Sequence, residues 1–183
     1  LRAGVPNEVP ELTINESITA REVDWQNNDV AVVYGNPPFP GVRWELLYNV
    51  KLRTVCSPTL FPFLELQRRN HTLRGITLLH EDDGSEWDRW AMAARTRLEG
   101  SQFVKVGSLA QAVASATQGK GIALASDILT RTLHREGRLI QPFSTTIKAA
   151  GSYYILFPND RGLSTRMTSL LQDLIGYLAS KPD

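Results

Sequence analysis

Cysteine is almost absent from this sequence: among 183 residues only Cys56 is present. The chain therefore cannot form an internal disulfide. Val55 before it and Ser57-Pro58 after it are typical of the end of a strand. We interpret Cys56 as a small buried hydrophobic residue rather than a reactive thiol.

Histidine is also scarce, and none of the histidines has a second one at the spacing of metal ligands. They are His71, His80 and His134. We therefore predict no metal and no other cofactor. A hydrolase triad of Ser108, His80 and an aspartate lacks the G-x-S-x-G turn around its serine, and Asp82-Asp83-Gly84 is typical of a turn into a helix. We predict that the chain is not an enzyme.

An excess of charge of one sign is missing as well. The chain contains 20 Lys and Arg residues and 19 Asp and Glu residues, which gives a net charge of +1. A domain that binds nucleic acid by itself usually carries a basic excess or a basic stripe. Because this chain shows neither, we expect that it does not bind nucleic acid by itself. No apolar run approaches the roughly 20 residues of a membrane span, and the given sequence does not open on a signal-peptide pattern.

The composition that remains is that of an ordinary globular domain. Hydrophobic residues make up 42% and aromatic residues 8% of the chain. A chain of this length can bury one full core, or divide into two small lobes.

Strand-like and helix-like segments alternate along the chain. The β-branched run at 29–34 predicts a strand buried on both faces, and the three prolines of 35–41 predict a loop. Residues 44–56 form a long extended segment, and further strands are expected at 12–14, 76–79, 103–106, 122–125, 139–140 and 153–157. The alternation favours α/β architecture with mainly parallel sheets, in one domain or in two lobes.

Helices are expected between these strands. Short ones are predicted after Thr19, where Glu22 completes a capping box, and at 58–70. Ser85 begins a helix with one apolar face, and Ser108 caps another that ends at Gly119. The apolar face of the first consists of Trp87, Trp90, Ala91, Ala94 and Leu98. A helix at 127–137 and a last one with an apolar stripe from Met167 to Leu178 complete the pattern.

Four stretches resemble one known family. They are D-V-A-V-V-Y-G (29–35), L-R-T-V-C-S-P-T-L (52–60), G-S-L-A-Q-A-V-A-S-A-T-Q-G-K-G-I-A-L (107–124), and G-R-L-I-Q-P-F (137–143) followed by G-S-Y-Y-I-L (151–156). In this order the chain resembles the effector domain of bacterial LysR-type transcriptional regulators, in the branch of the glycine-cleavage activator and the β-lactamase regulator.

The resemblance implies two Rossmann-like lobes joined by two crossing strands, as in type II periplasmic binding proteins. Lobe I would comprise 1–52 and 151–183, and lobe II 53–150, with crossings near 51–55 and 149–153. The family's lobe I begins with a strand and most of a helix before a segment like L-R-A-G-V-P (1–6). We expect that strand and the upstream winged helix-turn-helix to be missing from this sequence.

The resemblance also implies an effector site in the cleft between the lobes. Ser108 would face this cleft at a helix N-terminus, where a small carboxylate or phosphate binds well, although an N-cap role explains it too. Tyr34, Gly35 and Asn36 follow a strand, in the position where α/β folds bind ligands, and also suit a plain turn. The remaining candidates, each with a capping or packing alternative, are Tyr153, Ser17, Thr19 and His80.

The function predicted from these residues is the sensing of a small molecule. Promoter DNA would be bound only through the absent helix-turn-helix domain, in a cytoplasmic homodimer or homotetramer with no contact to a membrane. A periplasmic solute-binding protein of the same fold is the alternative. The upstream sequence, either a helix-turn-helix or a signal peptide, would distinguish the two.

Overall fold

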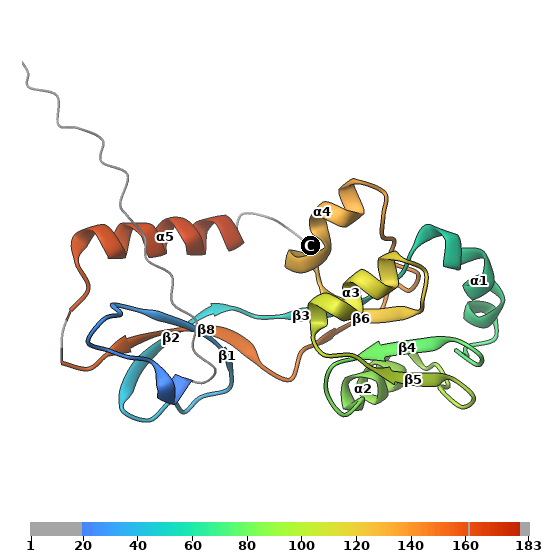
Figure 1. Cartoon of the computed structure of the whole chain (residues 1–183), viewed down its shortest axis with the longest axis horizontal. Helices are drawn as coiled ribbons and strands as arrows, with labels where there is room; N and C mark the ends of the chain where they lie inside the picture. The colour runs from blue at the N-terminus through green and yellow to red at the C-terminus, as the bar shows by residue number, and fades with distance from the viewer. Residues whose placement is uncertain (1–19, 161, 180–183) are drawn as a thin grey trace, which may run out of the picture.

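The computed structural model describes residues 20–160 and 162–179, and the strands form two separate sheets (Figure 1). The smaller sheet has the order β1 (Ala31–Gly35), β8 (Ser152–Pro158) and β2 (Val42–Tyr48). The larger sheet has the order β5 (Gln102–Lys105), β4 (Thr77–His80), β6 (Ile122–Ser126), β3 (Lys51–Val55) and β7 (Thr146–Lys148). Each sheet forms the centre of one lobe, which confirms the predicted two-lobe α/β fold.

The direction of the strands differs from the prediction. Only β4 pairs in parallel, with β5 and with β6, whereas β3 and β8 pair with all their neighbours antiparallel. The prediction of mainly parallel sheets was therefore wrong for the described strands. A crossover helix follows β4 and β5 and returns the chain in the same direction, but β3 and β8 enter their sheets from the other lobe.

Helices cover both faces of the larger sheet. On one face lie α1 (Phe61–Arg69) and α2 (Ser85–Ala94), and on the other α3 (Leu109–Thr117) and α4 (Asp127–Arg135). The central strand β6 is buried throughout, with Ile122 and Leu124 in one hydrophobic cluster and Ala123 and Ala125 in the other. This alternation is what a strand covered on both faces requires.

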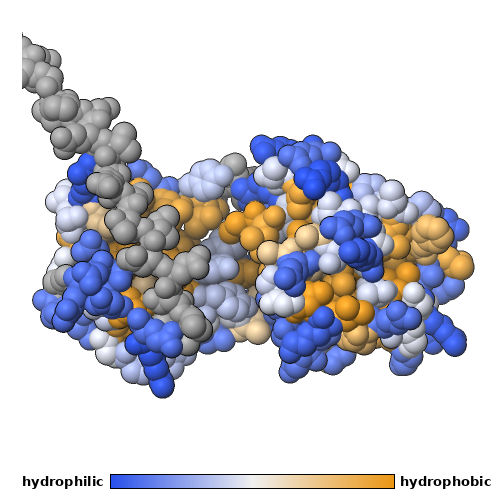
Figure 2. All heavy atoms as spheres, in the orientation of Figure 1, coloured by the Kyte–Doolittle hydropathy of each residue, from blue (hydrophilic) through white to orange (hydrophobic). Residues whose placement is uncertain are grey.

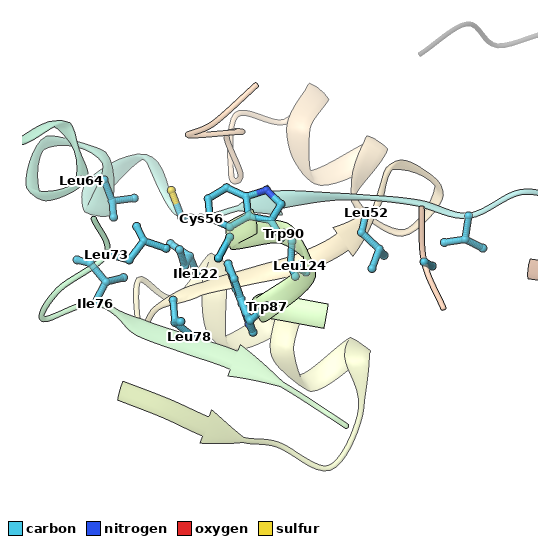
Figure 3. Close-up of a cluster of buried hydrophobic side chains, with 13 residues drawn as sticks. Leu52, Cys56, Leu64, Leu73, Ile76, Leu78, Trp87, Trp90, Ile122 and Leu124 are labelled. Carbon is cyan, nitrogen blue, oxygen red and sulfur yellow. The ribbon is translucent and has the colours of Figure 1, made fainter. Parts of the chain in front are cut away.

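Two tryptophans form the centre of the first cluster (Figure 3). The rings of Trp87 and Trp90 lie edge to face with centroids 5.6 Å apart. Both indoles are buried, and they donate to the carbonyls of Leu79 and Thr145 at 3.1 and 3.2 Å. Cys56 is buried in the same cluster, and burial raises the pKa of its thiol to about 11. Its interpretation as an inert hydrophobic residue agrees with this position.

Several helix and strand ends differ from the prediction. Helix α2 ends at Ala94 because Arg95 adopts a left-handed conformation with φ 50°, so Leu98 packs against the core from a loop instead of the helix. Ile140 forms only an isolated bridge with Cys56. Short 3-10 helices lie at η1 (Ala20–Glu22) and η2 (Pro58–Leu60), the latter leading into α1. The strand predicted at 12–14 lies outside the described residues.

The smaller sheet is covered by α5 (Thr165–Ala179). Ile155 and Phe157 of β8 pack against Leu171 of this helix. Strand β1 was predicted to be buried on both faces, but Val32 and Tyr34 are 51% and 50% exposed. Exposed and partly buried residues alternate along β1, so Val32 and Tyr34 share one face of the strand, and that face is only partly covered. Within 20–160 and 162–179, no helix has the length and apolar character of a membrane span.

Candidate functional site

The two crossing segments, 49–50 and 149–151, lie side by side between the lobes and are called here the interlobe seam (Figure 1). The backbone N–H of Ala149 donates to the carbonyl of Val50 at 2.9 Å. Next to it, the Ser152 hydroxyl donates to the Asn49 side chain at 3.2 Å. These bonds hold both crossings in one place, so residues that contact the seam occupy defined positions relative to both lobes.

Lobe I contributes the end of β1 to the seam. The Tyr34 hydroxyl accepts a hydrogen bond from the Gly151 N–H at 3.0 Å, and the Asn36 amide donates to the Ala150 carbonyl at 2.8 Å. The Tyr34 ring packs edge-on against Tyr153, with centroids 5.3 Å apart. The structure thus brings Tyr34 and Asn36 to the same crossing segment as Tyr153, which lies more than a hundred positions later in the sequence.

Close packing explains the glycine at position 151. A Cβ on Gly151 would lie 3.0 Å from Tyr34 Cζ and 3.1 Å from the carbonyl oxygen of Gly35. The predicted residue Gly35 therefore also faces the seam through its backbone. Burial raises the pKa of the Tyr34 phenol, the bond from Gly151 opposes this shift, and the negative charge of Glu86 adds to it.

Lobe II contributes the N-terminus of α2. The Glu86 carboxylate accepts a hydrogen bond from the Ala150 N–H at 3.1 Å, and Arg89 donates to the Lys148 carbonyl at 2.5 Å. Burial raises the pKa of Glu86, and the bond from Ala150 partly opposes it. The sequence prediction missed Glu86. The available signal was an acidic residue in the first turn of a helix that directly follows a strand end.

Ser108 caps α3, as predicted. Its hydroxyl accepts from the Gln111 N–H at 3.2 Å, and the Gln111 side-chain oxygen accepts from the Gly107 N–H at 2.9 Å. A second side chain reaches the same helix end, because the Glu81 carboxylate accepts from the Leu109 N–H at 2.5 Å. The charge of Glu81 also makes a small contribution to the raised pKa of Tyr34.

The other predicted site residues lie differently. The His80 side chain is 12% exposed, with Nδ1 3.5 Å from an Asp82 carboxylate oxygen and its ring 6.1 Å from that of Phe103. These contacts describe packing at the end of β4, which was the alternative considered for His80. Ser17 and Thr19 lie outside the described residues. The position of each of these residues in a ligand site remains a prediction.

Neither of two hollows in the described surface is lined by a described residue of the predicted site. One of about 560 Å³ lies between α2 and β5, lined by residues that include Met92, Arg95 and Phe103. The other, of about 270 Å³, lies beside the seam between β2 and α5 and includes Tyr48 and Lys51. Figure 2 shows apolar and charged residues interleaved on the face drawn. The candidate site therefore rests on the contacts at the seam and not on the depth of a pocket.

A second polar interaction, made by helix α4, links the two lobes. The Tyr48 hydroxyl, at the end of β2, donates to the Asp127 carboxylate at 2.7 Å, and Arg131 donates to the other oxygen at 2.7 Å. Burial alone would raise the pKa of Asp127, but these bonds and the charge of Arg131 outweigh burial and lower it. The lobes are thus linked by side chains as well as by the crossing strands.

Comparison with known proteins identifies related sequences. The chain is 26% identical over 161 residues to the glycine cleavage system transcriptional activator of Escherichia coli K12, covering 85% of this chain and 51% of the relative. It is 28% identical over 172 residues to the HTH-type transcriptional activator AmpR of Rhodobacter capsulatus, covering 92% and 57%. The chain therefore spans about half the length of the curated relatives that it matches.

Solved structures show the same fold. The effector domain of AmpR from Pseudomonas aeruginosa matches with a TM-score of 0.69 at 23% identity, covering 87% of this chain and 76% of that one. The AmpR effector-binding domain from Citrobacter freundii matches with a TM-score of 0.70 at 23% identity, covering 85% and 77%. The family model of the LysR substrate binding domain matches residues 6–179. The chain therefore belongs to the LysR substrate-binding domain family.

Proposed function

We propose that this chain is the effector-sensing part of a LysR-type transcriptional regulator and binds a small molecule at the interlobe seam. The observation that carries the proposal is that both lobes bind consecutive amides of one crossing segment. Tyr34 of lobe I accepts from Gly151, and Glu86 of lobe II accepts from Ala150. A small molecule in contact with these residues would therefore touch both lobes at once.

Such a ligand would act through its differential affinity for two lobe or subunit arrangements. The relatives are named as transcriptional activators, which supports a regulator over a periplasmic solute-binding protein. DNA would be bound by a helix-turn-helix domain elsewhere in the protein, in a cytoplasmic homodimer or homotetramer. We keep lobe boundaries at 1–52 with 151–183, and at 53–150.

The proposed ligand contacts are those predicted from the sequence. Tyr34, Gly35 and Asn36 would contact the effector from lobe I, with Tyr153 beside them. Ser108 would contact it from lobe II, where the N-terminus of α3 favours an anionic group such as a carboxylate or phosphate.

A Ser108→Leu variant tests this site. We would screen small metabolites against the parent chain by thermal shift, and measure the strongest binder by calorimetry in both proteins. Loss of the cap should cost about 1 kcal/mol of stability, and effector affinity should fall roughly tenfold or more. Ser169→Leu, an exposed serine on α5, is the matched control and should bind like the parent.

Two results would contradict the proposal. Unchanged affinity in a folded Ser108→Leu protein would remove Ser108 from the site. A bound metabolite that perturbs amide signals around the hollow at Met92, and leaves those of Gly151 and Ala150 in place, would remove the seam as the site.

A further inference from the structure

The Glu81 carboxylate occupies a position where anions bind. It accepts from Leu109 N–H, the first amide of α3, at 2.5 Å, although the two residues are 28 positions apart. A helix N-terminus presents free N–H groups and the positive end of the helix dipole, both of which attract negative charge. In this structure the chain itself supplies that negative charge.

Two further amides in the first turn of α3 are bound by uncharged groups. Ser108 Oγ accepts from Gln111 N–H, and the Ser108 carbonyl accepts from Ala112 N–H, which is the ordinary pattern of a capped helix. Glu81 thus adds a charged acceptor to a helix end that Ser108 already caps. Its side chain is exposed and extends from the loop after β4, so it can rotate into water without disturbing the core.

The surroundings of Glu81 are already negative. Glu86 lies on the next helix, and the charge of Glu81 contributes to the raised pKa of Glu86 as well as to that of Tyr34. An anionic group that enters with Glu81 in place would meet two carboxylates. If Glu81 rotates away, the same group gains the Leu109 amide and loses one repulsive neighbour.

We propose that Glu81 is an internal ligand, which occupies the anion position at the N-terminus of α3 until an anionic group of the effector displaces it. The inference rests on the proposed function and deepens it. Glu81 would set the affinity threshold of the sensor, because a tethered carboxylate competes with every free one. It would also discriminate against weak anions, which cannot displace it.

The test uses acetate and inorganic phosphate as probes, titrated at constant ionic strength into the 183-residue chain. The amide signals of Leu109 and Ala110 are followed by NMR in the parent, Glu81→Gln and Glu81→Ala. Glu136→Gln is the control, because Glu136 is an exposed carboxylate paired with Arg138. Both Glu81 variants should bind the probes roughly tenfold more tightly than the parent. Acetate should also move their Leu109 signal towards its position in the parent.

Either of two outcomes would overturn the inference. One is parental probe affinity in both folded Glu81 variants. The other is an equal gain in Glu136→Gln, which would make the effect one of net charge only. Failure of the proposed function would look different: probes would bind at Leu109 in Glu81→Ala, but no metabolite would perturb the seam. Conversely, an effector that binds at the seam and leaves the Leu109 signal unmoved would contradict the inference alone.

Discussion

Replacing Gly151 by alanine should show how tightly the second crossing segment is packed against the end of β1 at the seam. The new Cβ would lie 3.0 Å from Tyr34 Cζ, 3.1 Å from Tyr34 Cε1 and 3.1 Å from the carbonyl oxygen of Gly35. Gly151 does not have a positive φ, so the cost of alanine comes from these contacts and not from backbone strain.

The neighbours of the new methyl group can move only by giving up other interactions. The Tyr34 ring would have to leave the hydrogen bond from Gly151 N–H at 3.0 Å and its edge contact with Tyr153. Overpacking costs about 1–3 kcal/mol, and the lost hydrogen bond about 1 kcal/mol. We expect the free energy of unfolding to fall by roughly 2 kcal/mol in total, or about 4–8 °C in Tm for a chain of this size.

Alanine substitutions at two other glycines serve as controls, because the direction of their effect on stability can be predicted. A Cβ on Gly121 would lie 2.6 Å from the Thr77 carbonyl oxygen, which belongs to the neighbouring strand, so Gly121→Ala should destabilise more than Gly151→Ala. A Cβ on Gly176, within α5, meets nothing within 4 Å. Gly176→Ala should therefore stabilise the chain by up to about 1 kcal/mol, through helix propensity.

Urea and thermal unfolding of the four proteins, followed by tryptophan fluorescence, would measure these changes. The reasoning predicts the stability order Gly176→Ala, parent, Gly151→Ala, Gly121→Ala. A Gly151→Ala protein that unfolds with the parent would refute the claim that the seam is closely packed against Tyr34.

Three further results are expected. Trp90→Phe should lower the free energy of unfolding by roughly 2 kcal/mol in urea, because a cavity opens and the Thr145 carbonyl loses its donor. Asp127→Asn should cost about 1 kcal/mol at pH 7, since its carboxylate is only partly buried. Because folding lowers the pKa of Asp127, its contribution is present above the ordinary value of 3.8 and is lost as the pH falls through the lower folded value. The difference between parent and variant should therefore vanish in acid, and a constant difference would argue against the bonds from Tyr48 and Arg131. The Cys56 thiol should react with a thiol reagent only after unfolding, and rapid labelling of the native chain would contradict its burial.

The helix starts and the core tryptophans could be predicted from the sequence because their signals are local. Ser108 and Gln111 cap α3 within a few residues, and Trp87 and Trp90 share a helix face by spacing alone. Family resemblance supplied the two-lobe arrangement, which periodicity left open. Local pattern failed where neighbours in space decide the outcome. It predicted burial on both faces for β1, and it placed Leu98 in a helix instead of a loop.

The candidate site also has a part that could be predicted from the sequence and a part that could not. Tyr34, Asn36 and Ser108 could be selected from the chain, because each lies at the end of a strand or the start of a helix, at a recognisable position. Their partners could not, since the bond of Tyr34 to Gly151 joins residues 117 positions apart and that of Glu81 to Leu109 joins residues 28 apart. No periodicity encodes such a distance. These contacts exist because two crossing segments and two sheets come together, and their geometry arises only when the lobes have folded.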